Sequence, residues 1–335
     1  MKKTGPIRGR RTLLIVGVSF VSLLPVTDAL SSPTLPARAS SPSTTEFAVA
    51  GPGPVPVGIT AGPDGNMWFT DVKNGKIGRV TATGVMTEFT VPPHPATAED
   101  AGGDITAGPD GNLWSTEYRA ANIARVTVGG GITEFAVHQT PDSITVGGDG
   151  NLWFTEEGAG KIGRMTTTGV ATEYPLAAGS QPNQPVKGPD GNVWFTEQGS
   201  NRIGRITPSG AITEFAIPTA QARPAIITAG PDGNLWFTEQ DAGKIERITP
   251  AGAVAEFPIP TVQCGPYGIT AGPDGNLWFA ELAAGKIGRM TPAGAITEYP
   301  VPTSNSGPLN IAAGQGRTLW FTEFQGGKVG RITGI

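Results

Sequence analysis

Three polar residues stand at equivalent places in seven near-repeated segments, where the other segments carry small or apolar residues. The place lies two residues before the Ile of a recurring Gly-Ile-Thr motif. A carboxylate, an amide and a phenol among apolar neighbours suit a pocket for a small or peptidic ligand. We therefore predict that Asp142, Asn183 and Tyr267 bind a ligand, helped by His138, which precedes Asp142 in the same connection. The seven equivalents are Val57, Gly103, Asp142, Asn183, Ala225, Tyr267 and Leu309.

A second group of residues could bind a divalent metal ion. His94 and Asp100 lie in the longest connection between segments, and His138 and Asp142 lie in the next connection. Imidazole and carboxylate groups are suitable ligands if both connections meet over one site. Their spacing is irregular, however, and we favour the interpretation that they are solvated loop residues. The chain has only two histidines, which argues against a His-rich zinc site.

The remaining reactive groups give weaker indications. The single cysteine, Cys264, excludes an intramolecular disulfide. It could be a reactive thiol, but no histidine near it in the sequence would activate it, so we favour a small, half-buried residue. Lys187 and Arg223 could add positive charge near a ligand, although surface roles are favoured. The sequence contains neither a Gly-x-Ser-x-Gly nucleophile motif nor a phosphate-binding loop.

A repeated unit must position these residues. Each unit contains a variant of Gly-Pro-Asp-Gly-Asn-Leu-Trp-Phe-Thr-Glu, then Gly-Lys-Ile-Gly-Arg, then Ile-Thr-Glu-Phe. Four short strands joined by tight turns fit inside one unit, and 49 Gly and 31 Pro agree with many turns. The repeats are marked by Trp68, Trp114, Trp153, Trp194, Trp236, Trp278 and Trp320.

Seven such units predict an all-β fold, a seven-bladed β-propeller of four-stranded blades. The last unit lacks its fourth strand, and the missing Thr-Glu-Phe copy occurs near the N-terminus as Thr45–Phe47. We therefore expect this N-terminal strand to complete the last blade and close the ring. An open solenoid would instead need capping units. The predicted blades are 55–92, 102–137, 141–176, 182–218, 223–260, 265–302 and 307–335 with 44–49.

Most repeated residues are expected to be structural. The Pro-Asp-Gly-Asn segments could be calcium loops, but a tight turn explains them better, because Asp bonds the local backbone and Gly adopts the left-handed conformation. Seven acidic residues recur with seven arginines, and equal copies favour ion pairs between hairpins over one catalytic site. The acidic set is Asp71, Glu117, Glu156, Glu197, Glu239, Glu281 and Glu323. The basic set is Arg79, Arg125, Arg164, Arg205, Arg247, Arg289 and Arg331.

The N-terminus reads as an export signal. Basic residues precede an apolar stretch in residues 1–29, which predicts a signal peptide cut after Ala29 or, alternatively, after Ala39. Arg10-Arg11 also permits twin-arginine export, although the general secretory route is favoured. Residues 30–43 predict a flexible leader, and residues 44–335 the propeller.

Charge limits the partners of the mature protein. Removing the signal peptide takes the net charge from −4 to −8. Such a surface is poorly suited to nucleic acid or to anionic lipid. We expect a secreted protein, extracellular or periplasmic, that is a monomer and binds neither nucleic acid nor membrane.

The segments Leu-Trp-Phe-Thr-Glu, Gly-Lys-Ile-Gly-Arg-Ile-Thr and Ile-Thr-Glu-Phe-x-Ile-Pro resemble the virginiamycin B lyase family over nearly all of residues 44–335. The resemblance implies a seven-bladed propeller. It also implies a carbon–oxygen lyase that opens a cyclic depsipeptide antibiotic, a streptogramin B, by elimination with a bound magnesium ion. The family's site resembles Pro-His-Ala-Ile in the sixth blade and Glu-Pro-His-Gly-Ile in the seventh. Here Tyr267 and Leu309 stand at the two histidine positions, and Gly307 stands at the glutamate position.

Three hypotheses for the function follow. The first is a secreted binding propeller that holds a small or peptidic ligand at the mouth of the central channel, without the family's usual catalytic residues and with no cofactor assigned. The second is an active magnesium-dependent lyase whose metal site has moved to His94 or His138 and nearby carboxylates. The third is a cell-wall or matrix interaction module, in which the propeller is a rigid display surface.

Overall fold

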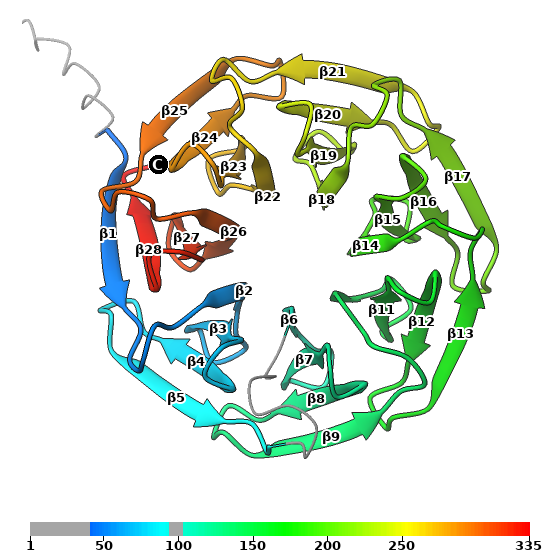
Figure 1. Ribbon diagram of the computed structural model, residues 1–335, viewed down its shortest axis with the longest axis horizontal. Helices are drawn as coiled ribbons and strands as arrows, with labels where there is room; N and C mark the ends of the chain where they lie inside the picture. Colours follow the sequence, from blue (N-terminus) through cyan, green and yellow to red (C-terminus); the bar gives the residue numbers. More distant parts are fainter. Residues whose placement is uncertain (1–40, 94–102) are drawn as a thin grey trace, which may run out of the picture. The chain divides into compact units, whose positions relative to one another are not determined.

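Four-stranded antiparallel sheets are arranged around a central channel (Figure 1). The computed structural model describes residues 41–93 and 103–335, and its regular structure there consists of strands. The seven sheets, called blades 1 to 7 here, pair their strands in chain order, except that the last blade also takes the N-terminal strand. First strands face the channel and fourth strands form the outer rim (Figure 1). The prediction of a seven-bladed β-propeller is confirmed.

The strands are short and nearly equal from blade to blade. Blade 1 contains β2 (Pro56–Ala61), β3 (Met67–Asp71), β4 (Lys76–Val80) and β5 (Met86–Thr90). Blade 2 contains β6 (Ile105–Ala107), β7 (Leu113–Glu117), β8 (Asn122–Val126) and β9 (Ile132–Ala136). Blade 3 contains β10 (Ile144–Val146), β11 (Leu152–Glu156), β12 (Lys161–Met165) and β13 (Ala171–Pro175). Blade 4 contains β14 (Pro182–Lys187), β15 (Val193–Glu197), β16 (Arg202–Ile206) and β17 (Ile212–Ala216).

The remaining blades follow the same plan. Blade 5 contains β18 (Pro224–Ala229), β19 (Leu235–Glu239), β20 (Lys244–Ile248) and β21 (Val254–Pro258). Blade 6 contains β22 (Pro266–Ala271), β23 (Leu277–Glu281), β24 (Lys286–Met290) and β25 (Ile296–Pro300). Blade 7 contains β26 (Pro308–Gly314), β27 (Thr318–Glu323), β28 (Lys328–Thr333) and, from the other end of the chain, β1 (Ser43–Ala48).

The ring closes through the N-terminal strand, as predicted. β1 pairs antiparallel with β28, with Phe47 opposite Val329. The Phe47 ring stacks on Trp320 at a centroid distance of 5.6 Å, and Glu46 pairs with Lys328 at 2.9 Å. Every other blade has the same kind of tryptophan-to-aromatic contact within its own continuous chain. The two ends of the chain are therefore joined within blade 7 by the same kinds of contact that hold the strands of the other blades together.

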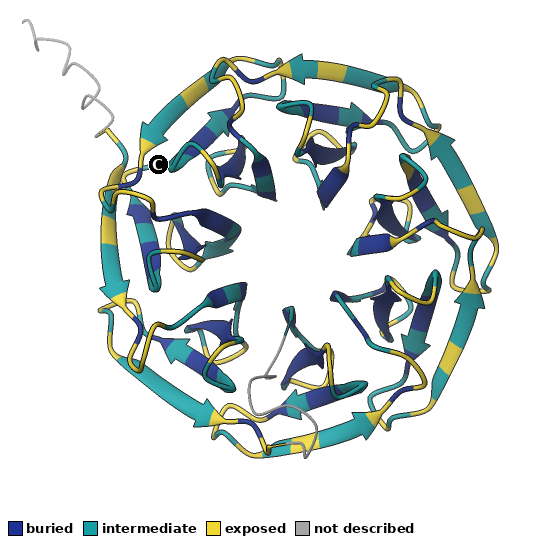
Figure 2. Cartoon of the chain, viewed as in Figure 1, coloured by how far each residue is buried: buried dark blue, intermediate teal, exposed yellow. Residues whose placement is uncertain are grey.

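The core lies between neighbouring blades. Each tryptophan packs against the second-strand residues of the next blade, so that Trp236 contacts a cluster containing Leu277 and Phe279. The same contact crosses the closure, because Trp320 shares a cluster with Phe69 of blade 1. All seven tryptophans are at most 2% exposed, which confirms their predicted core role. Burial is greatest on the inner strands and lowest on the outer rim (Figure 2).

The Pro-Asp-Gly-Asn turns hold the tryptophans in place. In blade 6, Asp274 Oδ1 accepts a hydrogen bond from Trp278 Nε1 at 3.0 Å and one from the Asn276 amide at 3.2 Å. Its Oδ2 accepts from Asn276 Nδ2 at 2.8 Å and from Arg289 Nε at 2.8 Å. These bonds lower the pKa of Asp274 against the opposing effect of burial. The structural interpretation of the turns is confirmed.

The predicted pairing of the acidic and basic sets is wrong, because the strand register separates them. Arg289 lies opposite Trp278, whereas Glu281 lies opposite Lys286 at the other end of the hairpin. Five of the arginines therefore reach the turn aspartates. The arginines also lie over the aromatic rings, with Arg289 5.8 Å from the Trp278 ring centroid. Glu281 is fully buried, and burial followed by the charge of Glu298 raises its pKa to about 8.

Removing the turn carboxylate should destabilise the fold. D274A leaves the indole N–H of Trp278 and the Arg289 guanidinium without this acceptor, so we expect the free energy of unfolding to fall by about 1–3 kcal/mol in a urea titration. T318A is the matched control, because Trp320 has only a 3.2 Å bond to Thr318 Oγ1 in a turn without aspartate, and its loss should be smaller. Equal losses in both variants would contradict this role for the aspartate.

The buried Glu281 should make stability depend on pH. Between about pH 4.5 and pH 8 the folded state keeps the Glu281 proton while the unfolded chain releases it, so this group's contribution to stability falls as pH rises through that window. E281Q retains the shape of the neutral acid. At pH 8 we expect the free energy of unfolding of E281Q, from a urea titration, to exceed that of the wild type by about 1–3 kcal/mol. The difference should disappear near pH 4.5. A difference that does not change with pH would argue against this.

Candidate functional site

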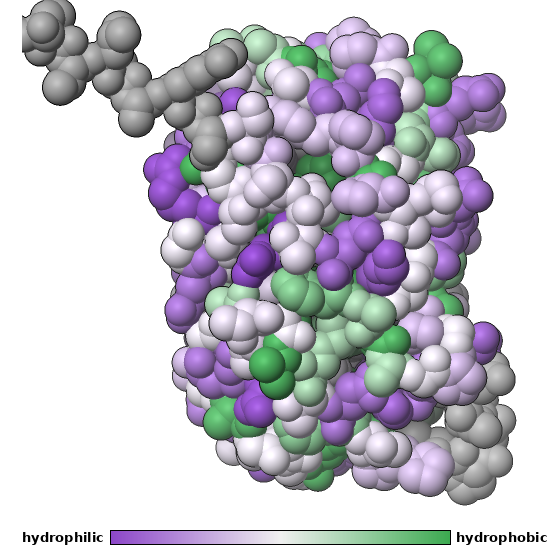
Figure 3. All heavy atoms as spheres, turned by 90° about the vertical axis from the view of Figure 1, so that its left-hand side faces the viewer, coloured by the Kyte–Doolittle hydropathy of each residue, from purple (hydrophilic) through white to green (hydrophobic). Residues whose placement is uncertain are grey.

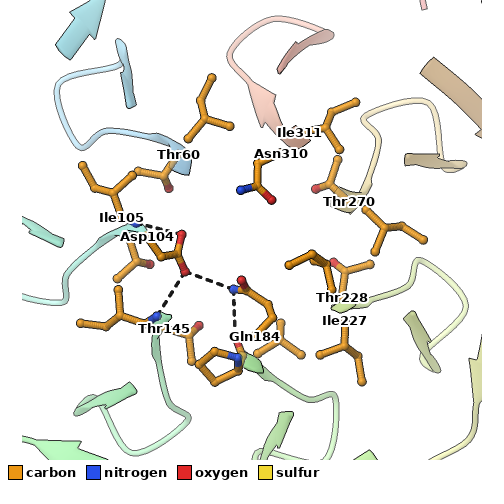
Figure 4. Close-up of a pocket in the computed structure, with 17 residues that line it drawn as sticks. Thr60, Asp104, Ile105, Thr145, Gln184, Ile227, Thr228, Thr270, Asn310 and Ile311 are labelled. Carbon is orange, nitrogen blue, oxygen red and sulfur yellow. Dashed lines mark hydrogen bonds between the residues drawn. The ribbon is translucent and has the colours of Figure 1, made fainter. Parts of the chain in front are cut away.

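The channel contains a cavity of about 260 Å³, which is lined by the first strands of the blades (Figure 4). Most of its lining consists of isoleucines and threonines from the recurring Ile-Thr pairs. Three polar residues break this pattern, namely Asp104, Gln184 and Asn310, and they come from blades 2, 4 and 7. All three stand one residue before the recurring Ile position, which places them deeper in the channel than the residues predicted from the sequence.

Asp104 joins three blades at the channel wall. Its carboxylate accepts hydrogen bonds from the Ile105 amide at 2.8 Å, the Ile144 amide at 3.1 Å and Gln184 Nε2 at 3.3 Å (Figure 4). Burial raises its pKa to about 6 despite these bonds. Asn310 Nδ2 donates to the Val57 carbonyl at 3.1 Å, which joins blade 7 to blade 1. These residues were missed because only the neighbouring sequence position was compared across the repeats.

Three of the predicted site residues come together at the mouth. The Tyr267 phenol lies near the side chain of Asn183, and burial followed by the charge of Asp142 raises its pKa to about 12. Asn183 is 7% exposed, and its Oδ1 also accepts the Gln184 amide at 2.7 Å. Residues from blades 3, 4 and 6 therefore form one polar group, the mouth cluster of Asp142, Asn183 and Tyr267.

Threonines of the recurring Trp-Phe-Thr-Glu segment fix the backbone of this cluster. Thr238 Oγ1 of blade 5 donates to the Tyr267 carbonyl at 2.7 Å. Thr116 Oγ1 of blade 2 donates to the Asp142 carbonyl at 2.8 Å. The same contact joins five pairs of neighbouring blades, whereas blade 6 has Ala280 in place of the threonine. Recurring threonines therefore hold the backbone of mouth residues whose side chains differ from blade to blade.

The mouth cluster can hold a proton near neutral pH. Burial, then the charges of Glu157 and Asp104, raise the pKa of Asp142 to about 7. A carboxyl group in this state can accept or donate a hydrogen bond to a ligand, and it attracts hydrogen-bond donors and cations when ionised. Arg223 also lies near, since its charge opposes the rise in the Tyr267 pKa.

A second cavity of about 450 Å³ lies between blades 3, 4 and 5. Glu157 lines this cavity, and its charge is one of the causes that raise the pKa of Asp142. Its volume falls within the range of small-ligand sites. Both charge signs are present, because Arg223 and Asp241 form a long ion pair at 3.9 Å. The lining residues are Glu157, Gln181, Gln198, Gly199, Asn201, Gln221, Arg223 and Asp241.

Other predicted residues lie elsewhere. His138 is 79% exposed on its side chain and contacts Glu173 of β13 at 3.0 Å, toward the rim of blade 3. His94 and Asp100, the other members of the suggested metal group, lie outside the described residues. Lys187 ends β14, whereas Asn183 lies near its beginning, so Lys187 is at the far end of the channel.

Cys264 is fully buried, and burial followed by the charge of Glu281 raises its pKa to about 12. This leaves the thiol protonated and unreactive at neutral pH. The interpretation as a small structural residue agrees with the structure, although the side chain is buried more completely than expected.

The positions that the family resemblance assigns to catalysis do not fit a magnesium ion. Leu309 is 7% exposed and has no donor atom on its side chain, and Gly307 has no side chain. Tyr267 keeps its proton, because its pKa is about 12. A nearby cavity of about 270 Å³ contains Gly307 and is lined by small, apolar and amide side chains. These residues offer neither a carboxylate nor an imidazole as a metal ligand.

Comparisons with known proteins agree with this architecture. The family model described as the virginiamycin B lyase family matches residues 38–138 and 95–334. A streptogramin B lyase structure is 38% identical, with a TM-score of 0.82 over 87% of this chain and 97% of that chain. A catalytically inactive virginiamycin B lyase from Staphylococcus aureus, solved with quinupristin, is 39% identical, with a TM-score of 0.82 over 88% of this chain and 99% of that chain.

A more distant propeller shows the fold alone. It is the extracellular domain of a hybrid two-component system from B. thetaiotaomicron, with 12% identity and a TM-score of 0.66 over 84% of this chain and 40% of that chain. A search of curated proteins gave no match. The family model and the lyase structures together cover the propeller from its first strand to its last. The chain therefore belongs to the virginiamycin B lyase family.

Proposed function

We propose that this protein is a secreted binding propeller, which holds a small or peptidic ligand at the channel mouth without the metal-dependent elimination chemistry of its family. The observation that carries the proposal is the mouth cluster, in which Asp142, Asn183 and Tyr267 converge from three blades. Ligand-binding groups that come from separate blades and depart from the repeat are expected of a recognition site on a symmetric scaffold.

The chemistry of the mouth favours a ligand with hydrogen-bond donors. Asp104, Asp142 and Glu157 concentrate carboxyl groups there, while Asn183 and Tyr267 add neutral polar groups. A peptide or depsipeptide offers amide N–H groups and, in many cases, an amine. The cavity of about 450 Å³ beside the cluster gives room for such groups.

Secretion is part of the same proposal. It is supported by the predicted signal peptide in residues 1–29. Among the described residues, no helix is long and apolar enough to cross a membrane. The rim surface seen in Figure 3 mixes hydrophilic and hydrophobic side chains. A mixed surface does not indicate a particular wall or matrix partner, whereas the mouth cluster indicates a bound ligand. We therefore favour ligand binding over the alternative of a wall or matrix module.

Binding should depend on the mouth cluster. We expect full-length protein to bind quinupristin in isothermal titration calorimetry, and the triple variant D142A/N183A/Y267F to lose at least tenfold in affinity with little change in melting temperature. K187A is the matched control, because it alters the same strand β14 at the other end of the channel. Equal affinity in the wild type and the triple variant would refute the site, and absence of binding to the wild type would refute this ligand class.

Catalysis provides the test against the lyase alternative. We expect no linearised quinupristin after long incubation with this protein and magnesium chloride, because Leu309 and Gly307 replace side chains that could act as base or ligand. Virginiamycin B lyase from Staphylococcus aureus without the inactivating substitution serves as the positive control. Chromatography with tandem mass spectrometry distinguishes the cyclic and linear forms. A linear product above the enzyme-free background would establish the alternative function.

A further inference from the structure

Blade 5 differs from the other blades at one buried position. The middle residue of the third strand is Gly in five blades and Ala124 in blade 2, but it is Glu246 in blade 5. In β20 this residue lies directly opposite Glu256 of β21. Like charges at directly opposed positions destabilise an antiparallel pair unless another group compensates them.

The glutamate side chain reaches the recurring buried carboxylate of its own blade. In blade 4, a Cβ added at the equivalent Gly204 would lie 2.2 Å from the Phe195 ring and 2.8 Å from Glu197 Oε1, so a side chain at this position lies beside both the ring and the carboxylate. In blade 5, carboxylate oxygens of Glu239, Glu246 and Glu256 all lie within 4.8 Å of one another. Hard cations such as Ca²⁺ bind oxygens at about 2.3–2.6 Å, so ligands on opposite sides of one ion are about 5 Å apart.

The cluster has buried oxygens without partners. Glu239 and Glu246 are both fully buried. Among the described residues, neither oxygen of Glu239 nor Oε2 of Glu246 has a hydrogen-bond partner at normal geometry. The recurring glutamate also has unpartnered oxygens in other blades, as in Glu281, so the feature peculiar to blade 5 is the unpartnered oxygen of Glu246 beside them. An ion that the structure does not contain is one recognised explanation for such an atom.

The neighbouring groups compensate only part of the charge. Lys244 Nζ lies 3.2 Å from Glu256 and 2.8 Å from Thr219 Oγ1. Thr219, from the connection that follows blade 4, also contacts Glu256 and lies 3.4 Å from Glu246 Oε1. One ammonium group therefore faces three carboxyl groups.

We propose that Glu239, Glu246 and Glu256 bind a hard divalent cation, with the Thr219 hydroxyl as a further oxygen ligand. The ion would replace Lys244 as the counter-charge of Glu256, whose side chain is 37% exposed and gives access from solvent. Such an ion ties strands β19, β20 and β21 to the connection from blade 4. The site is separate from the mouth cluster and does not depend on the proposed ligand.

Proton release should accompany the binding of the cation. Because a carboxylate must lose its proton to bind metal, affinity should increase with pH.

The test uses EDTA-treated full-length protein with CaCl₂ and, separately, MgCl₂, followed by calorimetry and thermal unfolding at pH 8. We expect saturable binding of at least one ion by the wild type, with a rise in melting temperature of about 3 °C. Both effects should disappear in E246G, which restores the residue of the other blades, and in E246Q, which keeps the side-chain shape if E246G folds poorly. E197Q in blade 4 is the control that should keep them.

Two results would overturn the proposal. One is the absence of saturable binding of either ion by the wild type. The other is an equal melting-temperature shift in the wild type, E246Q and E197Q, which would indicate a general salt effect.

Discussion

The structure depends on the contact between one buried tryptophan and its surroundings, repeated seven times. Each indole fills the space between two blades and, in six of the seven, stacks within its blade at centroid distances between 5.2 and 5.8 Å. In six blades a turn aspartate accepts the indole N–H, and in blade 7 Thr318 accepts it instead. An arginine lies over the tryptophan ring, as Arg289 does over Trp278. Aromatic pairs add about 0.5–1.5 kcal/mol beyond their burial. Each tryptophan side chain therefore combines apolar packing with a hydrogen-bonded indole N–H group.

Because recurring residues hold the blades together, a symmetric ring can carry a site made of residues that differ from blade to blade. In five blades the threonine two residues after the tryptophan bonds to the beginning of the next first strand, as Thr238 does to Tyr267. The backbone of the mouth is thus fixed by residues that hardly vary among the repeats. Side chains at the mouth can change without disturbing the packed tryptophans, which is consistent with the different residues that the seven repeats carry there.

The fold could be predicted from the sequence because its signals are local and repeated. Tryptophan spacing gave the number of blades, and the displaced Thr45–Phe47 copy gave the closure through β1 and β28. The predicted Glu–Arg pairs failed because residue counting cannot say which ends of a hairpin its charged residues occupy. In the observed register, Glu281 faces Lys286 and the arginine faces the tryptophan.

The site was predictable only in part. Comparing one position across the repeats selected Asp142, Asn183 and Tyr267, which remain predictions. Asp104 lies one residue after the position compared, and it has partners in other blades. His138 was included for its closeness in sequence to Asp142, and its contact with Glu173 depends on how the connection runs toward the rim. The spacing of residues within one repeat does not predict such contacts, because they depend on how the connections between strands run.

Hydrogen–deuterium exchange with and without quinupristin tests the central claim most directly, namely that selectivity lies at the hub of a uniform ring. The account predicts that slowed exchange is confined to the beginnings of the first strands around Asp142, Asn183 and Tyr267. Slowed exchange on the outer strands such as β13 or β21, or no change anywhere, would contradict it.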